Sequence, residues 1–155
     1  GLSITLLALA CALPGALSTA LADSRQMPAS AMLPAYQQEC AACHMAYPPG
    51  MLPASSWSRM MKGLDQHYGT DASLDPAMVR QISVWLEAHA GTYKRVREAP
   101  PQDRITQSAW FERKHRDIEP AVWKRASIGS RANCMACHTR ADQGDFDDDR
   151  VRIPK

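Results

Sequence analysis

A chain of 155 residues is long enough for one modest domain or two very small ones. Its formal net charge is only +2, and we expect no nucleic-acid partner. With four Trp, four Tyr and two Phe, the chain cannot fill two separate cores unless something other than side chains helps to fill them.

The first 22 residues contain no charged side chain and are rich in Leu and Ala. They end in the small-x-small sequence Ala20-Leu21-Ala22, directly before the charged Asp23. This pattern is typical of a secretory signal peptide, here without its basic start. A Pro-Gly pair interrupts the apolar run, which makes a membrane anchor the weaker interpretation. We expect residues 1–22 to be the end of a signal peptide and the mature chain to be exported to the periplasm.

Two helices are predicted early in the mature chain. The first runs from about Ala31 to His44 and is followed by a loop rich in Pro and Gly. The second begins after Pro53 with a Ser as its N-cap, and its apolar residues recur at i, i+3, i+4 and i+7. We expect His67 to continue this apolar stripe and Gly69 to stop the helix.

A third helix is predicted to begin at Asp75-Pro76, where a capping Asp precedes a Pro at the first helical position. It carries apolar residues and His89 on one side. A charged segment broken by prolines follows. We place a domain boundary there, between an N-terminal domain of residues 23–96 and a C-terminal domain of residues 97–155.

The C-terminal part contains less regular structure. Trp110, Phe111 and His115 lie at helical spacing, and Pro120 breaks or restarts that helix. No strand pattern persists anywhere in the chain. The sequence therefore predicts a mainly α protein whose second domain is helical and irregular.

Two identical motifs carry the chemistry of the chain. Cys40-Ala-Ala-Cys43-His44 and Cys134-Met-Ala-Cys137-His138 both read C-x-x-C-H and use every cysteine of the mature chain. This motif attaches a c-type haem through two thioether bonds and supplies the adjacent His as an iron ligand. We therefore expect two covalently bound haem c groups, with His44 and His138 on the irons. Two such haems would also fill the cores that the side chains cannot.

Other uses of paired cysteines fit less well. The two pairs begin 94 residues apart, farther than in a zinc ribbon, and zinc does not explain the His that follows each pair. Thioredoxin-like redox pairs would need a βαβ context, which the pattern does not contain.

Each iron also needs a sixth ligand or an open face. The three remaining histidines are His67, His89 and His115, and all of them lie on predicted apolar faces. For the first haem, His67 and His89 are competing candidates. Among the methionines, Met60 and Met61 are possible ligands, although hydrophobic packing is their more ordinary role.

A longer set of residues surrounds these motifs in a specific order. Before or between the haem motifs lie Tyr36, Glu39, Tyr47-Pro48-Pro49, Leu52-Pro53-Ala54, Trp57, His67-Tyr68-Gly69, Asp71-Ala72-Ser73-Leu74, Arg104-Ile105-Thr106, Trp110-Phe111, His115 and Trp123, and Gly144-x-Phe146 follows them. In this set the sequence resembles the diheme cytochrome c family known as DHC, over nearly the whole mature chain.

The resemblance implies an N-terminal domain similar to class I cytochrome c and a separate, small C-terminal haem domain. It also implies that two histidines ligate each iron, with His67 as the distal ligand of the first haem and His115 as that of the second. His89 is not a position of the family pattern. Because two imidazoles lower the potential of a haem relative to a His/Met pair, both haems should have low potentials.

The resemblance further implies an electron carrier rather than an enzyme. Such proteins resemble the electron donor to a small oxygen-binding monohaem cytochrome, the sphaeroides heme protein, and a membrane b-type cytochrome is the expected upstream donor. An alternative is the diheme electron-transfer subunit of a periplasmic reductase, such as nitrate reductase. A haem peroxidase is a weaker alternative, since it needs an open axial position and a longer chain.

Charge is distributed unevenly along the chain. Residues 94–140 contain eleven Lys or Arg and five Asp or Glu, whereas the segments on either side are slightly acidic. The basic segment could steer an acidic partner or could be an ordinary solvated surface. We expect a monomer that docks its acceptor, a soluble c-type haem protein, on this segment.

Overall fold

The computed structural model describes residues 31–155, so the predicted signal peptide lies outside the described residues. The described chain contains five α-helices connected by loops and short 3₁₀ turns, and its only β feature is an isolated bridge between His67 and Thr70. None of its helices is long and apolar enough to span a bilayer. The prediction of a mainly α fold is confirmed.

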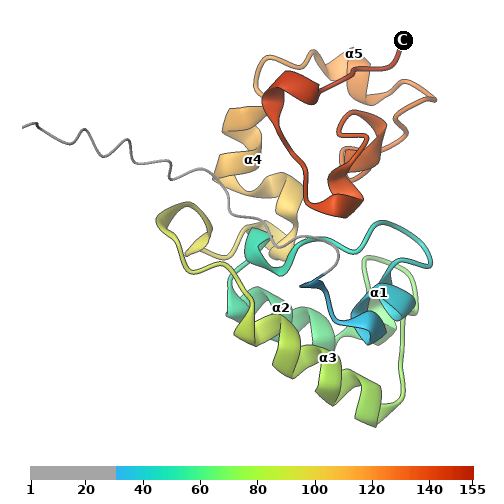
Figure 1. The fold of residues 1–155 in the computed structure, drawn as a ribbon, viewed down its shortest axis with the longest axis vertical. Helices are drawn as coiled ribbons and strands as arrows, with labels where there is room; N and C mark the ends of the chain where they lie inside the picture. The colour runs from blue at the N-terminus through green and yellow to red at the C-terminus, as the bar shows by residue number, and fades with distance from the viewer. Residues whose placement is uncertain (1–30) are drawn as a thin grey trace, which may run out of the picture.

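The N-terminal half consists of α1 (Pro34–Cys40), α2 (Ala54–Lys62) and α3 (Pro76–Ala88). Helices α2 and α3 pack side by side, and α1 lies against α3 (Figure 1). Between them lies a small core that combines two aromatic side chains with aliphatic ones. Its buried residues are Met32, Tyr36, Ala46, Leu52, Trp57, Met61, Ile82 and Leu86.

Helix α3 begins as its sequence predicts. The side chain of Asp75 accepts hydrogen bonds from the backbone N–H groups of Ala77 and Met78, and Pro76 occupies the first helical position. The helix ends at Ala88, with His89 as its C-cap.

Helices α1 and α2 differ from their predictions. Helix α1 stops at Cys40, so the rest of the first haem motif lies in a turn rather than on the helix. Helix α2 has Pro53 as its N-cap, without any side-chain hydrogen bond, and the expected Ser cap is wrong. It ends at Lys62, because Gly63 caps it earlier than Gly69 would. His67 therefore follows a short 3₁₀ turn and does not continue the helical stripe.

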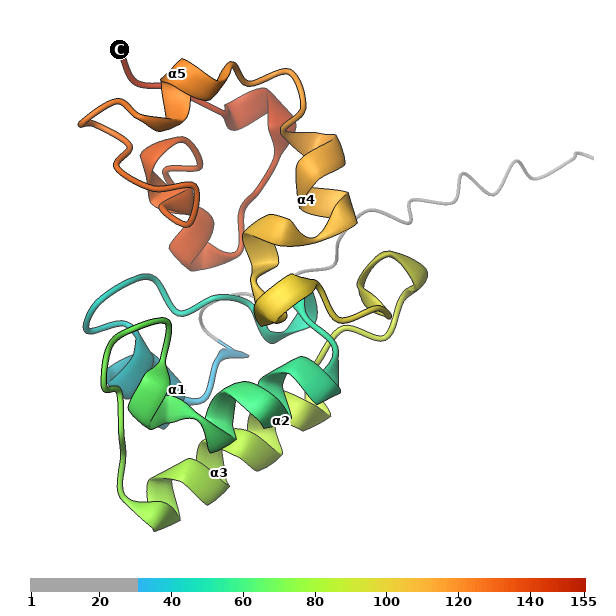
Figure 2. The same ribbon diagram turned by 180° about the vertical axis from the view of Figure 1, so that it is seen from behind.

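The C-terminal half contains only two short α-helices, α4 (Ala109–Lys114) and α5 (Pro120–Trp123). Its remaining residues form 3₁₀ turns and loops, and Figure 2 shows them wrapped around the space beside α4. Pro120 restarts the chain as a new helix, as the sequence predicts. This half is helical and irregular, in agreement with the expected fold class.

Several side-chain contacts join segments on either side of residue 97, where we place the domain boundary. Arg59 on α2 forms an ion pair with Asp103, with an N–O distance of 2.6 Å. The hydroxyl of Tyr68 donates to the carbonyl of Gln102 over 3.1 Å, and that of Tyr47 donates to the carbonyl of Ala132 over 2.7 Å. The boundary itself stays a prediction.

Candidate functional site

The first C-x-x-C-H motif lies at the surface of the N-terminal half. Cys40 is the last residue of α1, and Cys43 and His44 follow in an exposed turn. The Nδ1 atom of His44 lies 2.7 Å from the carbonyl oxygen of Met45. Because a carbonyl can only accept, the ring donates from Nδ1, and its Nε2 is left free to bind a metal.

The imidazole ring of His67 faces that of His44. The centroids of the two imidazole rings are 6.1 Å apart, and the ring planes differ by 28°. Two imidazoles that bind one metal ion from opposite sides, each through a bond of about 2.0–2.1 Å, have centroids roughly 6 Å apart. The 3₁₀ turn at Leu64–Gln66 brings His67 to this position.

The second motif repeats the same arrangement with a different local structure. His138 follows Cys137, and its backbone N–H donates to the carbonyl of Cys134 over 2.8 Å. His115, the C-cap of α4, faces it with a centroid distance of 6.2 Å and an interplanar angle of 80°. The Nδ1 of His115 donates to the carbonyl of Phe111 over 2.9 Å, which again leaves Nε2 free.

The other candidate ligands lie elsewhere. His89 packs on Trp85 at the end of α3, and its Nδ1 donates to the carbonyl of that residue over 2.8 Å. Met61 is buried in the N-terminal core, and Met60 packs against that core. His89 thus contacts Trp85, whereas His67 is the histidine that faces His44.

Burial favours the neutral form of one histidine and of at least one cysteine at each site. It lowers the pKa of His67, with His44 and Arg104 adding to the effect, and it lowers the pKa of His138, with His115 adding to it. A neutral imidazole is the form that binds a metal. Burial also raises the pKa of the Cys40 and Cys134 thiols to about 11, which is unlike the lowered pKa of a reactive redox cysteine.

All four described cysteines are free rather than joined in disulfides. Within residues 31–155, no group of three or more His, Cys, Asp or Glu side chains converges as a metal site. A structural zinc ion would need about four such ligands. A haem iron takes its remaining ligands from the macrocycle, so a pair of facing histidines is sufficient.

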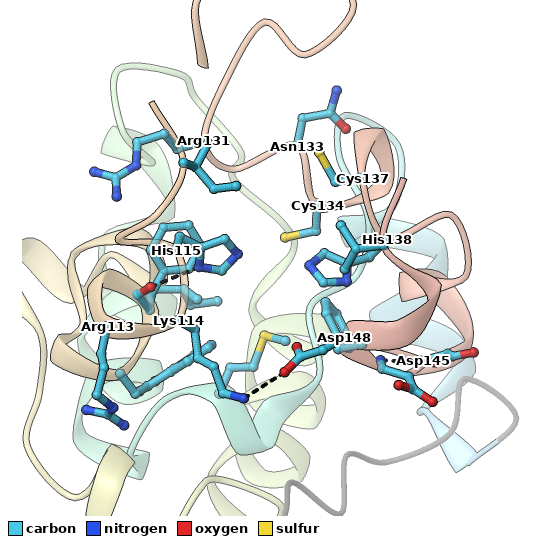
Figure 3. Close-up of a pocket in the computed structure, with 18 of the residues that line it drawn as sticks. Arg113, Lys114, His115, Arg131, Asn133, Cys134, Cys137, His138, Asp145 and Asp148 are labelled. Atoms are coloured by element: carbon cyan, nitrogen blue, oxygen red, sulfur yellow. Dashed lines mark hydrogen bonds and ion pairs between the residues drawn. The ribbon is translucent and has the colours of Figure 1, made fainter. Parts of the chain in front are cut away.

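A cavity of about 650 Å³ separates His115 from His138 (Figure 3). This volume lies within the range of about 300–1,000 Å³ that is usual for cofactor and small-molecule sites. The thiol of Cys134 points into the space between the two imidazoles. The apolar part of the wall consists mainly of Ile105, Trp110, Phe111, Val122, Trp123, Ile128 and Phe146.

The chain that follows the second motif forms one wall of this cavity. Phe146, Asp148 and Val151 all line it, and the backbone N–H of Arg152 donates to the carbonyl of Cys137 over 3.0 Å. Lys114, the last residue of α4, pairs with Asp148 on the opposite wall at 3.0 Å (Figure 3). The segment 145–153 therefore folds back over the motif.

Two buried donors in the cavity wall have no hydrogen-bond partner within the described chain. They are the indole Nε1 of Trp110 and the Nε of Arg131. An unpaired buried donor is costly, and a haem brings two carboxylates that can accept. The guanidinium of Arg131 also stacks at 5.2 Å over Phe111 and 5.3 Å over Trp123. The same guanidinium pairs with Glu112 at 2.9 Å through another nitrogen, so its Nε is the atom left for a haem carboxylate. Trp110 and Arg131 fit a haem here and would hold its carboxylates.

Comparison with known proteins shows which family has this combination of two haem motifs. The family model for dihaem cytochrome c matches residues 36–146 of the chain. The chain belongs to the dihaem cytochrome c family. It is thus an electron-transfer protein with two covalently bound haem c groups, which supply one-electron redox chemistry when attached.

Solved dihaem cytochromes share its fold. A diheme cytochrome c from Rhodobacter sphaeroides is 42% identical, with a TM-score of 0.66, and the match covers 75% of this chain and 98% of that one. A diheme cytochrome c from Shewanella baltica OS155 is 37% identical, with a TM-score of 0.69, over 83% of this chain and 95% of that one. No curated protein matches the chain significantly.

Sequence reasoning missed the polar lining of the second haem cavity. Trp110 reads as one apolar residue of a helical stripe, and Arg131 as one basic residue among many. A signal for Trp110 exists, because a buried indole N–H normally needs an acceptor. No comparable signal distinguishes Arg131 from the other basic residues of the segment 94–140.

Proposed function

We propose that this dihaem cytochrome c is a periplasmic electron carrier in which two histidines ligate each iron. His44 and His67 would bind the first iron, and His138 and His115 the second. The facing imidazole pairs carry this proposal, because both have the centroid separation that one shared metal ion requires, 6.1 and 6.2 Å. Cys40, Cys43, Cys134 and Cys137 would form the thioether bonds.

Closed axial positions favour electron transfer over catalysis. An enzyme such as a peroxidase must bind its substrate at an iron, and therefore needs a vacant or displaceable ligand. Two imidazoles on each iron leave no such vacancy and lower the potential of both haems. The chain would then hold the haems near each other, set their potentials and offer a docking face.

The proposed electron donor is a membrane b-type cytochrome, and the proposed acceptor is a soluble c-type haem protein such as an oxygen-binding monohaem cytochrome. Low-potential haems suit this order, since electrons move toward the higher potential. Two histidines on each iron would also suit the diheme electron-transfer subunit of a periplasmic reductase. The match to the dihaem cytochrome c family favours a free carrier.

Charge supports docking on the basic segment. Residues 94–140 hold the excess of Lys and Arg, and Lys94, Arg97 and Lys124 are all exposed. Complementary charge speeds the encounter of two proteins, and salt screens it over a Debye length of about 8 Å at physiological ionic strength.

Stopped-flow transfer to a soluble c-type haem acceptor tests this function. The reduced protein should donate electrons rapidly at low salt and more slowly as salt rises. Replacing Lys94, Arg97 and Lys124 with Glu should slow transfer at low salt, with both haem potentials nearly unchanged. The matched control, Glu87→Lys, reverses an exposed charge on α3 and should have little effect. If the transfer rate of the unmodified protein does not change with salt concentration, docking on the basic segment is contradicted.

A further inference from the structure

One side chain contacts both the first haem motif and the chain that leads into the second. Tyr47 lies in the loop between α1 and α2, three residues after His44. Its hydroxyl donates a hydrogen bond of 2.7 Å to the carbonyl of Ala132, which lies 85 residues away in the chain. Ala132 is two residues before Cys134, so the bond ends at the entry to the second motif. In Figure 1 the loop that carries Tyr47 runs along the edge of the C-terminal half.

The ring of the same residue lies on the first motif. The centroids of Tyr47 and His44 are 5.0 Å apart, and their planes differ by 30°. A single aromatic side chain therefore packs against the motif histidine of the first site and hydrogen-bonds the main chain of the second.

The base of this contact is rigid. The carbonyl of Tyr47 accepts a 2.8 Å hydrogen bond from the hydroxyl of Tyr36, which is buried in the N-terminal core. The next two residues, Pro48 and Pro49, are buried and have restricted backbone angles. Tyr47 thus extends from a fixed point toward the second motif.

The hydroxyl also lies close to the attachment cysteine of the second haem, since Cys134 acts on it electrostatically.

Two other side-chain contacts between the halves serve different segments. Arg59 and Tyr68 reach Asp103 and Gln102, which lie in the connecting chain, far along the sequence from either haem motif. Those two contacts hold the connection in place. The Tyr47 contact joins the first motif to the chain that leads into the second.

We propose that Tyr47 is a positioning residue that fixes the two haem motifs relative to each other and so sets the rate at which an electron passes between the haems. One electron leaves one haem and arrives at the other. Tyr47 is neither oxidised nor deprotonated in this step. Its contribution is the fixed separation and the close contact that the exchange requires.

The test is the replacement Tyr47→Phe in the protein carrying both haems. Phe keeps the ring on His44 and removes only the hydrogen bond to Ala132. We expect electron exchange between the haems, measured by pulse radiolysis of one-electron-reduced protein, to slow severalfold. The magnetic interaction between the two ferric irons, measured by electron paramagnetic resonance, should weaken as well.

Two further variants make the test specific. Ser127→Ala removes an exposed hydroxyl–carbonyl bond of 3.0 Å to Lys155 within the C-terminal half, and it should leave the exchange unchanged. Placing 4-aminophenylalanine at position 47 restores a donor and should restore the rate. The proposal is overturned if Tyr47→Phe exchanges electrons at the unmodified rate, if Ser127→Ala slows exchange equally, or if the amino variant is as slow as Phe.

Discussion

The two proposed distal histidines are held in different ways. His115 caps α4, stacks on Phe111 at 4.0 Å and donates to the carbonyl of that residue. His67 follows a 3₁₀ turn, and its place depends on backbone contacts with Leu64 and Thr70. The second site is therefore anchored by side-chain packing, and the first by the course of the main chain.

Removing a distal imidazole should open one iron only. We expect His67→Ala to let carbon monoxide bind the reduced first haem, and His115→Ala to do the same for the second haem. Absorption spectra of the reduced protein under carbon monoxide measure the outcome. His89→Ala is the matched control and should leave both irons closed, because His89 lies on Trp85. Carbon monoxide binding in the His89 variant would show that the assignment of the first distal ligand is wrong.

The unpaired donor of Trp110 should influence the second haem. In Trp110→Phe the carboxylate that accepts from the indole loses its partner, and its negative charge then stabilises the ferric iron. The potential of the second haem should become more negative, and that of the first should stay nearly constant. A spectroelectrochemical titration measures both potentials.

Trp85→Phe provides the comparison, since Trp85 packs on Tyr36 in the N-terminal half. It should not shift the potential of the second haem. If the second haem has the same potential in Trp110→Phe as in the unmodified protein, the indole does not donate to a haem carboxylate as proposed.

At the scale of residues, the sequence identified both haem motifs but could not decide between His67 and His89 as the distal ligand of the first haem. C-x-x-C-H is a contiguous signal, so the sequence located both motifs directly. The choice between His67 and His89 depends on the turn after Gly63, which breaks the helical phase that the pattern assumed. Helical periodicity describes the faces of a single helix, so it could not predict which histidine lies opposite His44.

Helix starts were predictable where one residue carries the signal by its own hydrogen bonds. Asp75 caps α3 through two backbone N–H groups, and this pattern is visible in the sequence. Helix α2 has no such cap and is held by the burial of Trp57 and Met61, which are contacts of the folded protein. The early end of α1 likewise has no marker in its sequence.

Close packing explains why position 91 is a glycine. A Cβ atom on Gly91, just after α3, would lie 2.5 Å from the carbonyl oxygen of Gly50 and would also clash with Val96. We expect Gly91→Ala to lower the free energy of unfolding by about 1–3 kcal/mol, the usual cost of overpacking. Chemical denaturation of the protein with both haems measures the loss.

Gly63 provides a matched substitution at the end of α2. A Cβ atom there would meet its nearest neighbour, the carbonyl of Arg59, at an ordinary 3.6 Å. Gly63→Ala should change the free energy of unfolding by no more than about 0.5 kcal/mol. Equal losses in the two variants would contradict the steric explanation.

At the scale of the whole molecule, an ion pair links α2 to the connecting chain. The hydrogen bond from Arg59 holds the pKa of Asp103 below its usual 3.8. Since the folded-state pKa lies below the unfolded one, this pair stabilises the protein above pH 3.8, and the contribution disappears as the pH falls through the folded-state pKa.

Asp103→Asn should therefore be less stable than the unmodified protein at neutral pH and equally stable in acid. Asn is suitable because position 103 has a φ of 56°, a backbone conformation that Asn tolerates. Thermal unfolding of both haem-loaded proteins between pH 3 and pH 7 measures the difference. Asp142→Asn, at an exposed position, should show no such trend. A difference that persists unchanged in acid would assign the effect to packing instead.

The overall class of the molecule followed from its sequence, whereas the relation between its halves did not. Few aromatic residues and two haem motifs predicted small helical units built around cofactors. The contacts of Tyr47 with Ala132 and of Arg59 with Asp103 join residues 85 and 44 positions apart. No periodic pattern encodes such pairs, so they could not be read from the chain.

The wall that segment 145–153 builds over the second cavity has a consequence for the order of maturation. Cys134 and Cys137 must be accessible to the attachment machinery while their thioether bonds form. The segment that encloses them follows the motif in the chain and bonds to Cys137 through Arg152. We therefore expect the second haem to be attached before segment 145–153 folds over its motif. In the first motif Cys43 and His44 are exposed, although Cys40 is as partly buried as Cys134 and Cys137.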